Sequence, residues 1–309
     1  MGDENQFFSI IVPTYNRPRQ LFNCLKAISR LDFPSDRFEV IVVDDGSEYS
    51  LKTLLDPFNL LMDLKKVNAK HGGPANARNI GASKAIGSYL VFTDDDCEPT
   101  NNWLNCISER ALKMPNHAIG GKTINGLPDN IYSTSSQFLI SYLYEYYKTD
   151  FNYKRFFTSN NLSVPAAHFH AIGGFDETTY HHAAGEDRDF CYRWQKRGLR
   201  MIYDPNIVIY HYHRLNLRTF MYQHFNYGQS AFRFHHFHKH HDIKPIKFEP
   251  LSFYIKMLMF PFIYAQGSRL IRIQILLLLS QFFNTAGYLI EKFDFLRYKF
   301  LKYFLKILI

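Results

Sequence analysis

The chain has few cysteines for its length, and they form no recognisable ligand or disulfide pattern. Structural zinc sites and disulfide frameworks depend on closely spaced cysteines, and no CxxC pair occurs here. The spacing therefore favours reduced thiols in a cytoplasmic setting and predicts neither a zinc site nor a disulfide. The four positions among the 309 residues are Cys24, Cys97, Cys106 and Cys191.

Two common nucleotide-binding signatures are also missing. No GxGxxG follows the first expected strand, and no GxxxxGK[ST] occurs in the sequence. These absences count against a dinucleotide site and against a P-loop. An apolar leader is lacking too, because the acidic segment MGDENQ is followed at once by a strand pattern. We therefore expect no signal peptide and a body that stays in the cytoplasm.

Acidic side chains are scarce in the last part of the chain. Residues 251–309 hold five Lys, three Arg and two acids, so this segment carries +6 of the formal net charge of +8. The remaining body is close to neutral, which argues against a nucleic-acid-binding protein.

The basic residues of 293–309 alternate with Phe, Leu and Tyr, a pattern typical of a helix that lies in an anionic membrane interface. The segment from Ile273 to Ile290 is only 18 residues long and contains Gln and Asn, so it is at the limit of what could span a bilayer. We expect peripheral attachment to the inner face of the cell membrane. A true span and a soluble helical dimer interface are the alternatives.

What the first hundred residues do contain is an alternation of short apolar runs and helical patterns. This alternation predicts an α/β fold whose strands are mainly parallel, with right-handed crossovers and with the loops gathered at one edge of the sheet. The expected strands are 7–13, 38–43, 64–67 and 89–92, and the expected helices are 18–31, a stretch through 51–55, and 74–87.

Three consecutive aspartates follow the fourth expected strand, where ligands of α/β sheets bind. Alternate residues of an extended segment point the same way, so Asp94 and Asp96 can converge on one cation while Asp95 faces elsewhere. A divalent cation bridging to an anionic substrate would relieve the repulsion between these carboxylates. A solvated acidic turn is the alternative reading of the same residues.

The other loops at this edge offer groups suited to a nucleotide. The TYNRP loop supplies an aromatic face and polar groups, and the second loop supplies a carboxylate for a base or ribose donor. The HGGPANARN loop combines glycines, which allow close backbone approach, with an arginine that can meet a phosphate. The residues concerned are Pro13, Tyr15, Arg17, Asp45, Gly73 and Arg78.

Later segments add candidate catalytic and ligand groups. Glu186 and Asp187 precede a helical pattern, where carboxylates are stabilised as anions, and simple helix capping explains them equally well. His211 ends an expected strand over 201–209 and is the preferred imidazole ligand for Mn²⁺ or Mg²⁺, with His213 as the alternative. Asn161 and the turn at Gly174 are candidates for contacts to a sugar or an acceptor.

Seven motifs in order resemble the family 2 glycosyltransferases, which have the GT-A fold. They are FSIIVPTYNRP, VIVVDDGS, GGPANARNIGA, FTDDD, NNLSVPAAHFHAIGGFDE, GEDRDFCYRWQKRG and IYHYHR, within about residues 7–230. The resemblance implies a hexosyltransferase-type enzyme that moves a sugar from a nucleoside-diphosphate sugar, UDP-linked by expectation, to a hydroxyl with inversion.

The resemblance also implies roles for single residues. Asp94 and Asp96 match the DxD metal and diphosphate motif, with Asp95 beside them near the nucleotide, and Asp187 matches the catalytic base, with Glu186 next in line. Tyr15, Asp45 and Arg78 match nucleotide contacts.

For the whole chain we expect a glycosyltransferase domain over 1–230, with a nucleotide half to about 100 and an acceptor half from 101. A helical, membrane-associating segment would follow over 231–309. The expected acceptor is a carbohydrate or a lipid-linked molecule in cell-surface polysaccharide or glycolipid synthesis. A metal-dependent nucleotidyltransferase and a non-enzymatic basic membrane adaptor are the alternative functions.

Overall fold

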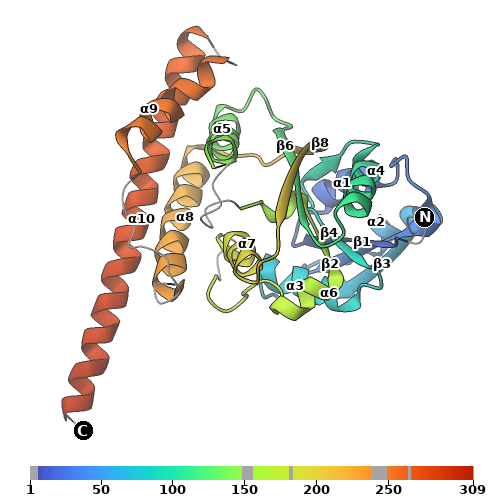
Figure 1. Cartoon of the computed structure of the whole chain (residues 1–309), viewed down its shortest axis with the longest axis horizontal. Helices are drawn as coiled ribbons and strands as arrows, with labels where there is room; N and C mark the ends of the chain where they lie inside the picture. The colour runs from blue at the N-terminus through green and yellow to red at the C-terminus, as the bar shows by residue number, and fades with distance from the viewer. Residues whose placement is uncertain (1–5, 148–155, 181–183, 239–248, 264–265, 309) are drawn as a thin grey trace. The chain divides into compact units, whose positions relative to one another are not determined.

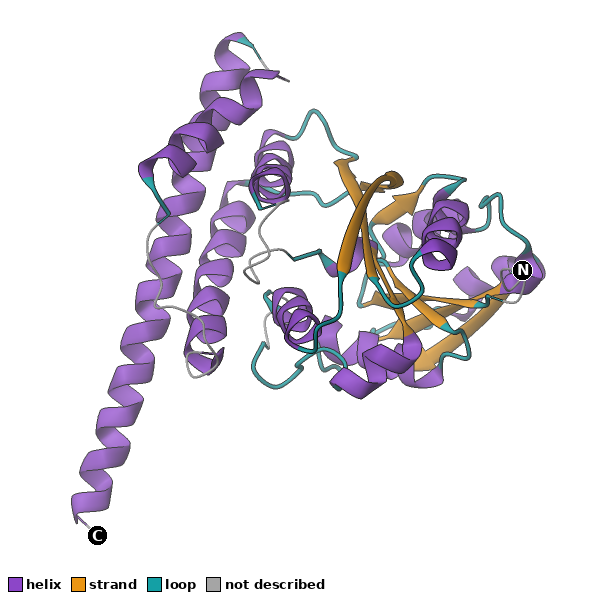
Figure 2. Ribbon diagram, in the orientation of Figure 1, coloured by secondary structure: helices purple, strands orange, loops and turns teal. Residues whose placement is uncertain are grey.

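The computed structural model describes residues 6–147, 156–180, 184–238, 249–263 and 266–308. The chain forms two compact units, and each is described by itself. The first comprises 1–126 and 148–213, and the second comprises 127–147 and 214–309. Strands occur in the first unit, whereas the described elements of the second are helical (Figure 2).

The first unit contains a mixed sheet of eight strands in the order β3-β2-β1-β4-β7-β6-β8-β5. The first four along the chain pair in parallel, as the βα alternation predicts, while β7 joins β4 and β6 antiparallel and β5 joins β8 antiparallel. The strands are β1 Phe8–Thr14, β2 Phe38–Asp44, β3 Asp63–Asn68, β4 Tyr89–Phe92, β5 Cys97–Pro99, β6 Ala118–Asn125, β7 Leu162–Pro165 and β8 Met201–His211.

Helices cover both faces of this sheet, with α1 and α4 on one side and α3 and α6 on the other (Figure 1). The strands β1 and β2 are buried on both faces and are mostly apolar, as is typical of central parallel strands. Ile10 and Val12 pack with α1 and α4, whereas Ile41 and Val43 pack with Ala77 of α3. The helices of this unit are α1 Pro18–Ile28, α2 Lys52–Leu55, α3 Pro74–Lys84, α4 Trp103–Lys113, α6 Ala166–Ile172 and α7 Glu186–Lys196.

Parallel register brings the loops after three strands to one edge. Thr14 pairs with Asp44 at the ends of β1 and β2, and β4 pairs with β1 in the same direction. The short strand β5, which no periodic pattern predicts, then pairs Cys97 with His211 at the end of β8. This pairing brings together two motifs more than a hundred residues apart.

The second unit consists of α5 Ile131–Tyr146, α8 Leu217–His238, α9 Leu251–Met259 and α10 Gly267–Leu308. Helices α8 and α10 approach closely, since a Cβ on Gly228 would lie 1.9 Å from the carbonyl oxygen of Asn284. Helices α5 and α8 belong to this second unit together with α9 and α10.

Two further elements complete the description. Strand β7 begins at Leu162, directly after a 3₁₀ turn over Ser159–Asn161. The long candidate tail helix is continuous from Gly267 to Leu308, and its segment Gly267–Arg297 is long and apolar enough to cross a membrane.

Candidate active site

Each of the three consecutive aspartates has its own partners. Asp94 Oδ1 lies 2.6 Å from Nη2 of Arg78. The buried Asp95 accepts a 2.7 Å hydrogen bond from the Thr14 hydroxyl. Nη1 of Arg17 lies 3.3 Å from Asp95 and 3.2 Å from Asp96. Arg78 therefore balances the charge of Asp94, whereas Asp95 and Asp96 share Arg17.

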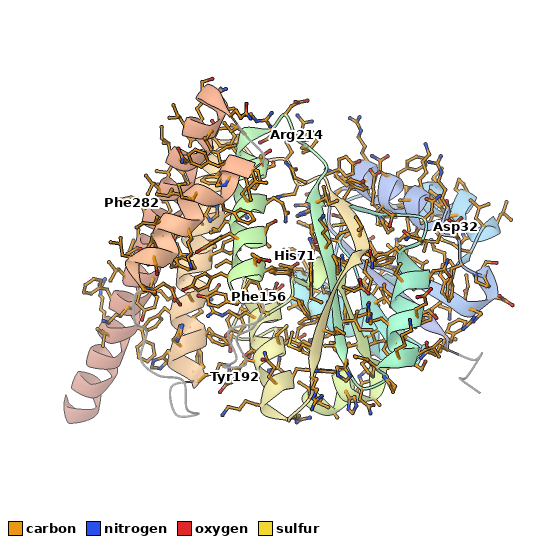
Figure 3. All side chains as sticks on the ribbon, turned by 45° about the horizontal axis from the view of Figure 1, so that its top comes forward. Asp32, His71, Phe156, Tyr192, Arg214 and Phe282 are labelled. Atoms are coloured by element: carbon orange, nitrogen blue, oxygen red, sulfur yellow. The ribbon has the colours of Figure 1, made fainter. Side chains whose placement is uncertain are left out.

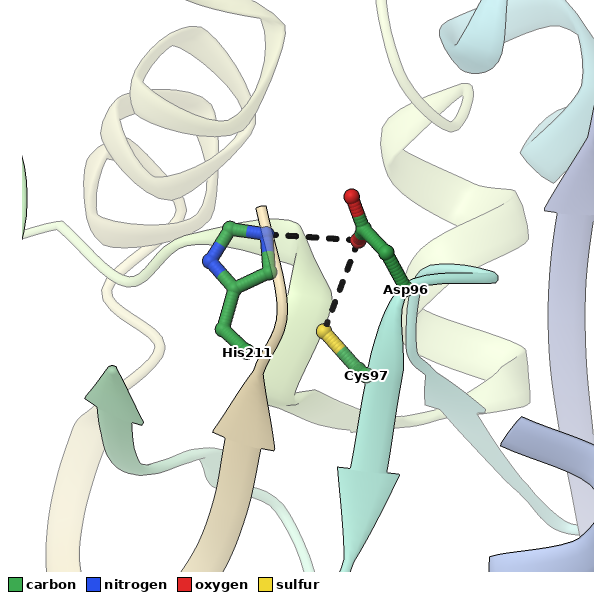
Figure 4. A group of neighbouring side chains, drawn as sticks. All are labelled: Asp96, Cys97 and His211. Carbon is green, nitrogen blue, oxygen red and sulfur yellow. Dashed lines mark hydrogen bonds and ion pairs between the residues drawn. The ribbon is translucent and has the colours of Figure 1, made fainter. Parts of the chain in front are cut away.

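Asp96 lies at the centre of a candidate cation site (Figure 4). Its Oδ1 atom lies 3.2 Å from Nε2 of His211, and 4.0 Å from the Cys97 sulfur. Among the described residues, Asp96, Cys97 and His211 form a group whose ligand atoms all lie within 4.8 Å of one another. Asp94 is not in this group; its carboxylate contacts Arg78 instead.

The chemistry of this group fits a hard divalent cation better than zinc. Burial raises the pKa of the Cys97 thiol well above its ordinary value, and the nearby aspartates raise it further, so the sulfur stays protonated and binds metal poorly. A carboxylate and an imidazole remain, which suit Mn²⁺ or Mg²⁺. The residues present therefore fit the cation that the resemblance implies, with Asp96 and His211 as its nearest ligands.

Burial and neighbouring charges separate the pKa values of Asp95 and Asp96. Burial raises the pKa of Asp95 to about 7, against the lowering effect of Arg17 and Thr14. Burial also opposes ionisation of Asp96, but the hydrogen bond and charge of His211, with Arg17, hold its pKa well below the usual range. Asp96 is consequently an anion at neutral pH and a ready ligand.

The loop after β3 is tied to Asp45 by backbone hydrogen bonds. Gly72 and Gly73 donate to the two carboxylate oxygens at 2.8 and 2.9 Å, and His71 Nδ1 lies 3.0 Å from Oδ2. Gly73 has a φ of +85°, which a side chain would strain. Carboxylate oxygens keep further lone pairs, so Asp45 holds the loop and can still accept from a ligand.

An aromatic platform lies beside this loop. The rings of Tyr15 and His71 stack with centroids 4.2 Å apart, and Tyr15 is 40% exposed. An exposed stacked pair suits a planar ring such as a nucleobase. His71, labelled in Figure 3, is a candidate site residue that the sequence patterns did not single out, although it directly precedes the two glycines. Pro13, in contrast, is buried within β1 and pairs with Val43.

Glu186 and Asp187 lie in the first turn of α7, as the sequence predicts. Glu186 is buried and contacts Arg78 at 3.0 Å. Burial, and then the charge of Glu186, raise the pKa of Asp187 to about 7. A carboxylate with a pKa near neutrality suits a general base, because it is a stronger base than a free aspartate and is still substantially ionised.

The three candidate sugar or acceptor residues differ in how accessible they are. The buried Asn161 amide donates to the carbonyls of Lys122 and Ile207 and accepts from the Trp103 indole, so its polar groups are taken up by the fold. Gly174 is a turn residue with a φ of +67°. The ring of His213 stacks on that of His211 at 4.8 Å, which places it beside the candidate cation site.

Two sequence profiles of known protein families match this chain. The sequence profile of glycosyl transferase family 2 matches residues 9–176, more than half of the chain. A second profile, described as the N-terminal domain of galactosyltransferase, matches residues 140–225 and so includes Glu186 and Asp187.

Two of the curated relatives match over shorter segments at higher identity. The glycosyltransferase AglE of Haloferax volcanii is 34% identical over 100 residues, which are 32% of this chain and 33% of that protein. The poly(ribitol-phosphate) β-N-acetylglucosaminyltransferase TarS of Staphylococcus aureus is 35% identical over 91 residues, 29% of this chain and 16% of that protein. The matched part thus spans a third or less of these relatives.

Solved structures match over nearly the whole chain. The mannosyltransferase PcManGT from Pyrobaculum calidifontis, in complex with GDP-Man and Mn²⁺, has a TM-score of 0.65 at 16% identity and covers 95% of this chain and 90% of that one. TarS 1–349 with UDP-GlcNAc has a TM-score of 0.53 at 19% identity and covers 94% and 92%. The likeness confirms the expected α/β, GT-A-like fold.

Proposed function

Because the chain belongs to glycosyl transferase family 2, we propose that it transfers a sugar from a nucleoside-diphosphate sugar to an acceptor hydroxyl with inversion. The observation that carries this proposal is the arrangement at the strand ends, where the aspartate run, His211 and the stacked Tyr15 and His71 occur in one unit with an acid of raised pKa, Asp187. The structural relatives hold GDP-Man and UDP-GlcNAc, so a nucleotide-sugar is the natural donor class, and we propose a UDP-linked one.

In the proposed reaction, Asp187 accepts the proton of the acceptor hydroxyl. The hydroxyl oxygen forms a bond to the anomeric carbon from the face opposite the leaving group, and the bond from that carbon to the nucleoside diphosphate breaks. A positioned base contributes about 10²- to 10⁴-fold to such a step. The leaving group departs as a nucleoside diphosphate rather than as pyrophosphate, which distinguishes this reaction from nucleotidyl transfer.

The donor contacts follow from the loops. Tyr15 and His71 would stack against the base, and Asp45 would accept from a base or ribose donor, close to the Gly73 backbone. Arg17 lies beside Asp95 and Asp96 with half of its side chain exposed, so it can turn to a diphosphate oxygen.

Asp96 and His211, with Asp94, would hold Mn²⁺ or Mg²⁺. When bound, the cation neutralises charge that develops on the departing diphosphate. PcManGT was solved with Mn²⁺, which supports this choice.

A thermal-shift screen of the full-length protein tests donor and cation together. We expect one nucleotide-sugar, with its nucleoside diphosphate, to raise the melting temperature with Mn²⁺ and much less without it. Stabilisation by no donor under either condition would contradict the proposal. A carbohydrate or lipid-linked acceptor in cell-surface polymer or glycolipid synthesis is our proposal for the other substrate, supported by the polymer in the name of TarS.

We also propose that the protein attaches to an anionic membrane surface on the cytoplasmic side, and the surface of helix α10 supports this. Apart from Ile290, its exposed apolar residues recur every three, four or seven positions, which places them on one face. Phe282, two-thirds exposed, is labelled in Figure 3. The residues of this apolar face are Ile271, Ile275, Leu278, Phe282, Leu289, Phe293 and Leu296.

Basic side chains border the apolar face on both sides. At about 100° per residue, Arg272 and Arg297 lie roughly 60–80° to one side of Phe282 and Lys292 roughly 80° to the other. Glu291 lies on the far side and pairs with Arg233 of α8. A second copy laid on this face would bring like charges together, whereas anionic headgroups would attract them.

Washing native membranes tests how the helix is attached. We expect alkaline carbonate or high salt to release the full-length protein, as for an interfacial helix. Retention that only detergent reverses would mean that Gly267–Arg297 crosses the bilayer.

A further inference from the structure

Arg78 has two acidic partners from separate parts of the chain. Its Nη2 atom lies 2.6 Å from Asp94 Oδ1, and its Nη1 atom lies 3.0 Å from Glu186 Oε1. Asp94 follows β4, whereas Glu186 begins α7. One side chain of α3 therefore joins the aspartate run to the helix that carries Asp187.

This junction is buried at its centre. The side chains of Arg78 and Glu186 are only 4% and 5% exposed. If one of them is removed, water cannot reach the other to stabilise its charge. Among the residues that the structure describes, the other carboxylate oxygen of Glu186 and Nε of Arg78 are buried and find no hydrogen-bond partner. Burial opposes the charge of Arg78, but Asp94 and Glu186 raise its pKa above the ordinary value, so it stays a cation. Both guanidinium ends are thus committed to the protein.

We infer that Arg78 is a positioning residue that holds Glu186 against Asp94 and thereby fixes the first turn of α7, rather than a ligand of the donor phosphates. Its effect on transfer rests on the proposed role of Asp187 as the base. The ion pairs themselves do not depend on that role.

The position of Asp187 makes this junction matter for catalysis. Its neighbours are the Glu186 charge, the Arg78 charge, and the backbone N–H groups of Arg188 and Ser159. Without Arg78, an unbalanced buried carboxylate would lie next to Asp187 in the chain. That carboxylate would repel the Asp187 anion and disturb the turn, and a displacement of about 1 Å can lower turnover by about 10²-fold.

The test compares Arg78→Gln with Arg17→Gln in the full-length protein. For Arg78→Gln we expect kcat to fall by about 10²-fold and the Kd of the nucleoside diphosphate with Mn²⁺ to stay within about threefold. We also expect its pH–rate profile to move to higher pH. Arg17→Gln is the contrast: it removes an exposed guanidinium proposed to contact the diphosphate, so it should raise Kd. A large rise in Kd with kcat retained in Arg78→Gln would overturn the inference.

A second measurement keeps the test decisive. If Arg78→Gln does not fold, Glu186→Gln removes the same ion pair from the other end, and an unchanged kcat there overturns the inference. The free energy of unfolding gives a test that does not depend on catalysis. The double variant Arg78→Gln/Glu186→Gln should lose less of this free energy than the two single variants lose in sum. Additive losses of stability would contradict the inference that Arg78 and Glu186 form one coupled junction. A wild-type protein that transfers no sugar would contradict only the proposed function.

Discussion

At the scale of single residues, the three aspartates are chemically unequal although the sequence presents them as a run. Asp94 is tied to Arg78, Asp95 to Thr14 and Arg17, and Asp96 to His211 and Arg17. The order of the motifs predicts that the run binds a cation. It does not predict these partners, because they come from strand pairing.

Replacing Asp96 tests its role as ligand. In Asp96→Asn we expect the Mn²⁺-dependent part of nucleoside-diphosphate binding to be lost, since an amide carries no charge to hold a hard cation. Calorimetry with and without Mn²⁺ measures it. Asp63→Asn, at an exposed residue of β3, is the matched control and should bind as wild type. Metal-dependent binding that persists in Asp96→Asn would remove Asp96 from the cation site.

The raised pKa of Asp187 predicts a pH dependence. A base with a pKa of about 7 in the free enzyme is protonated and inactive below that value, so kcat/KM should rise about tenfold per pH unit well below pH 7 and level off above pH 8. Steady-state rates between pH 5.5 and 9 measure this. A flat profile over that range would argue that another group takes the proton.

Changing the base to an amide separates binding from chemistry. In Asp187→Asn we expect donor Kd to stay close to wild type and kcat to fall by about 10²- to 10⁴-fold, because the amide keeps the shape and loses the basicity. Single-turnover assays and calorimetry on the same preparation check both quantities. Near-normal turnover would shift the assignment to Glu186.

At the scale of elements, periodicity predicts the parallel half of the sheet better than the rest. The apolar runs of β1, β2 and β4 are buried on both faces and are visible in the sequence. Strand β5 is three residues long and forms by pairing with β8, so no local sequence pattern predicts it. Asn161 likewise looks like a sugar ligand until its bonds to Trp103 and to two carbonyls are known.

Close packing of α8 on α10 predicts a large effect of a small change. A Cβ at Gly228 would lie 1.9 Å from the Asn284 carbonyl oxygen, so Gly228→Ala must push the helices apart. Overpacking of this kind costs about 1–3 kcal/mol. Chemical denaturation measures the loss, and Tyr222→Ala on the exposed side of α8 should change stability by no more than about 0.5 kcal/mol. Equal losses of stability in Gly228→Ala and Tyr222→Ala would contradict the close packing of α8 on α10.

At the scale of the whole molecule, the sequence predicts a catalytic body and a basic apolar tail, and the structure shows why the tail cannot simply be removed. Leu139 and Tyr142 of α5 pack with Phe253 of α9 and with α10, so a cut near residue 250 would expose this core. Helix α5 takes part in this core although it lies far earlier in the chain than α9 and α10. Membrane attachment is therefore better tested by surface substitutions.

Two charges on the apolar face should detach the protein without unfolding it. In Ile275→Glu/Phe282→Glu, at two exposed positions, we expect binding to anionic vesicles to fall by at least tenfold, because apolar burial is lost and repulsion is gained. Vesicle flotation measures it, and Leu60→Glu, on an exposed residue of the first unit, is the control. Undiminished flotation of the double variant would show that another surface contacts the lipid.

Product analysis tests the central claim most directly. The full-length protein is incubated with Mn²⁺, a nucleotide-sugar that stabilises it and a panel of acceptors, and phosphorus NMR identifies what is released. We predict a nucleoside diphosphate, together with a glycoside of inverted anomeric configuration, and loss of both in Asp187→Asn. Release of pyrophosphate, or a product that retains the donor configuration, would contradict the account.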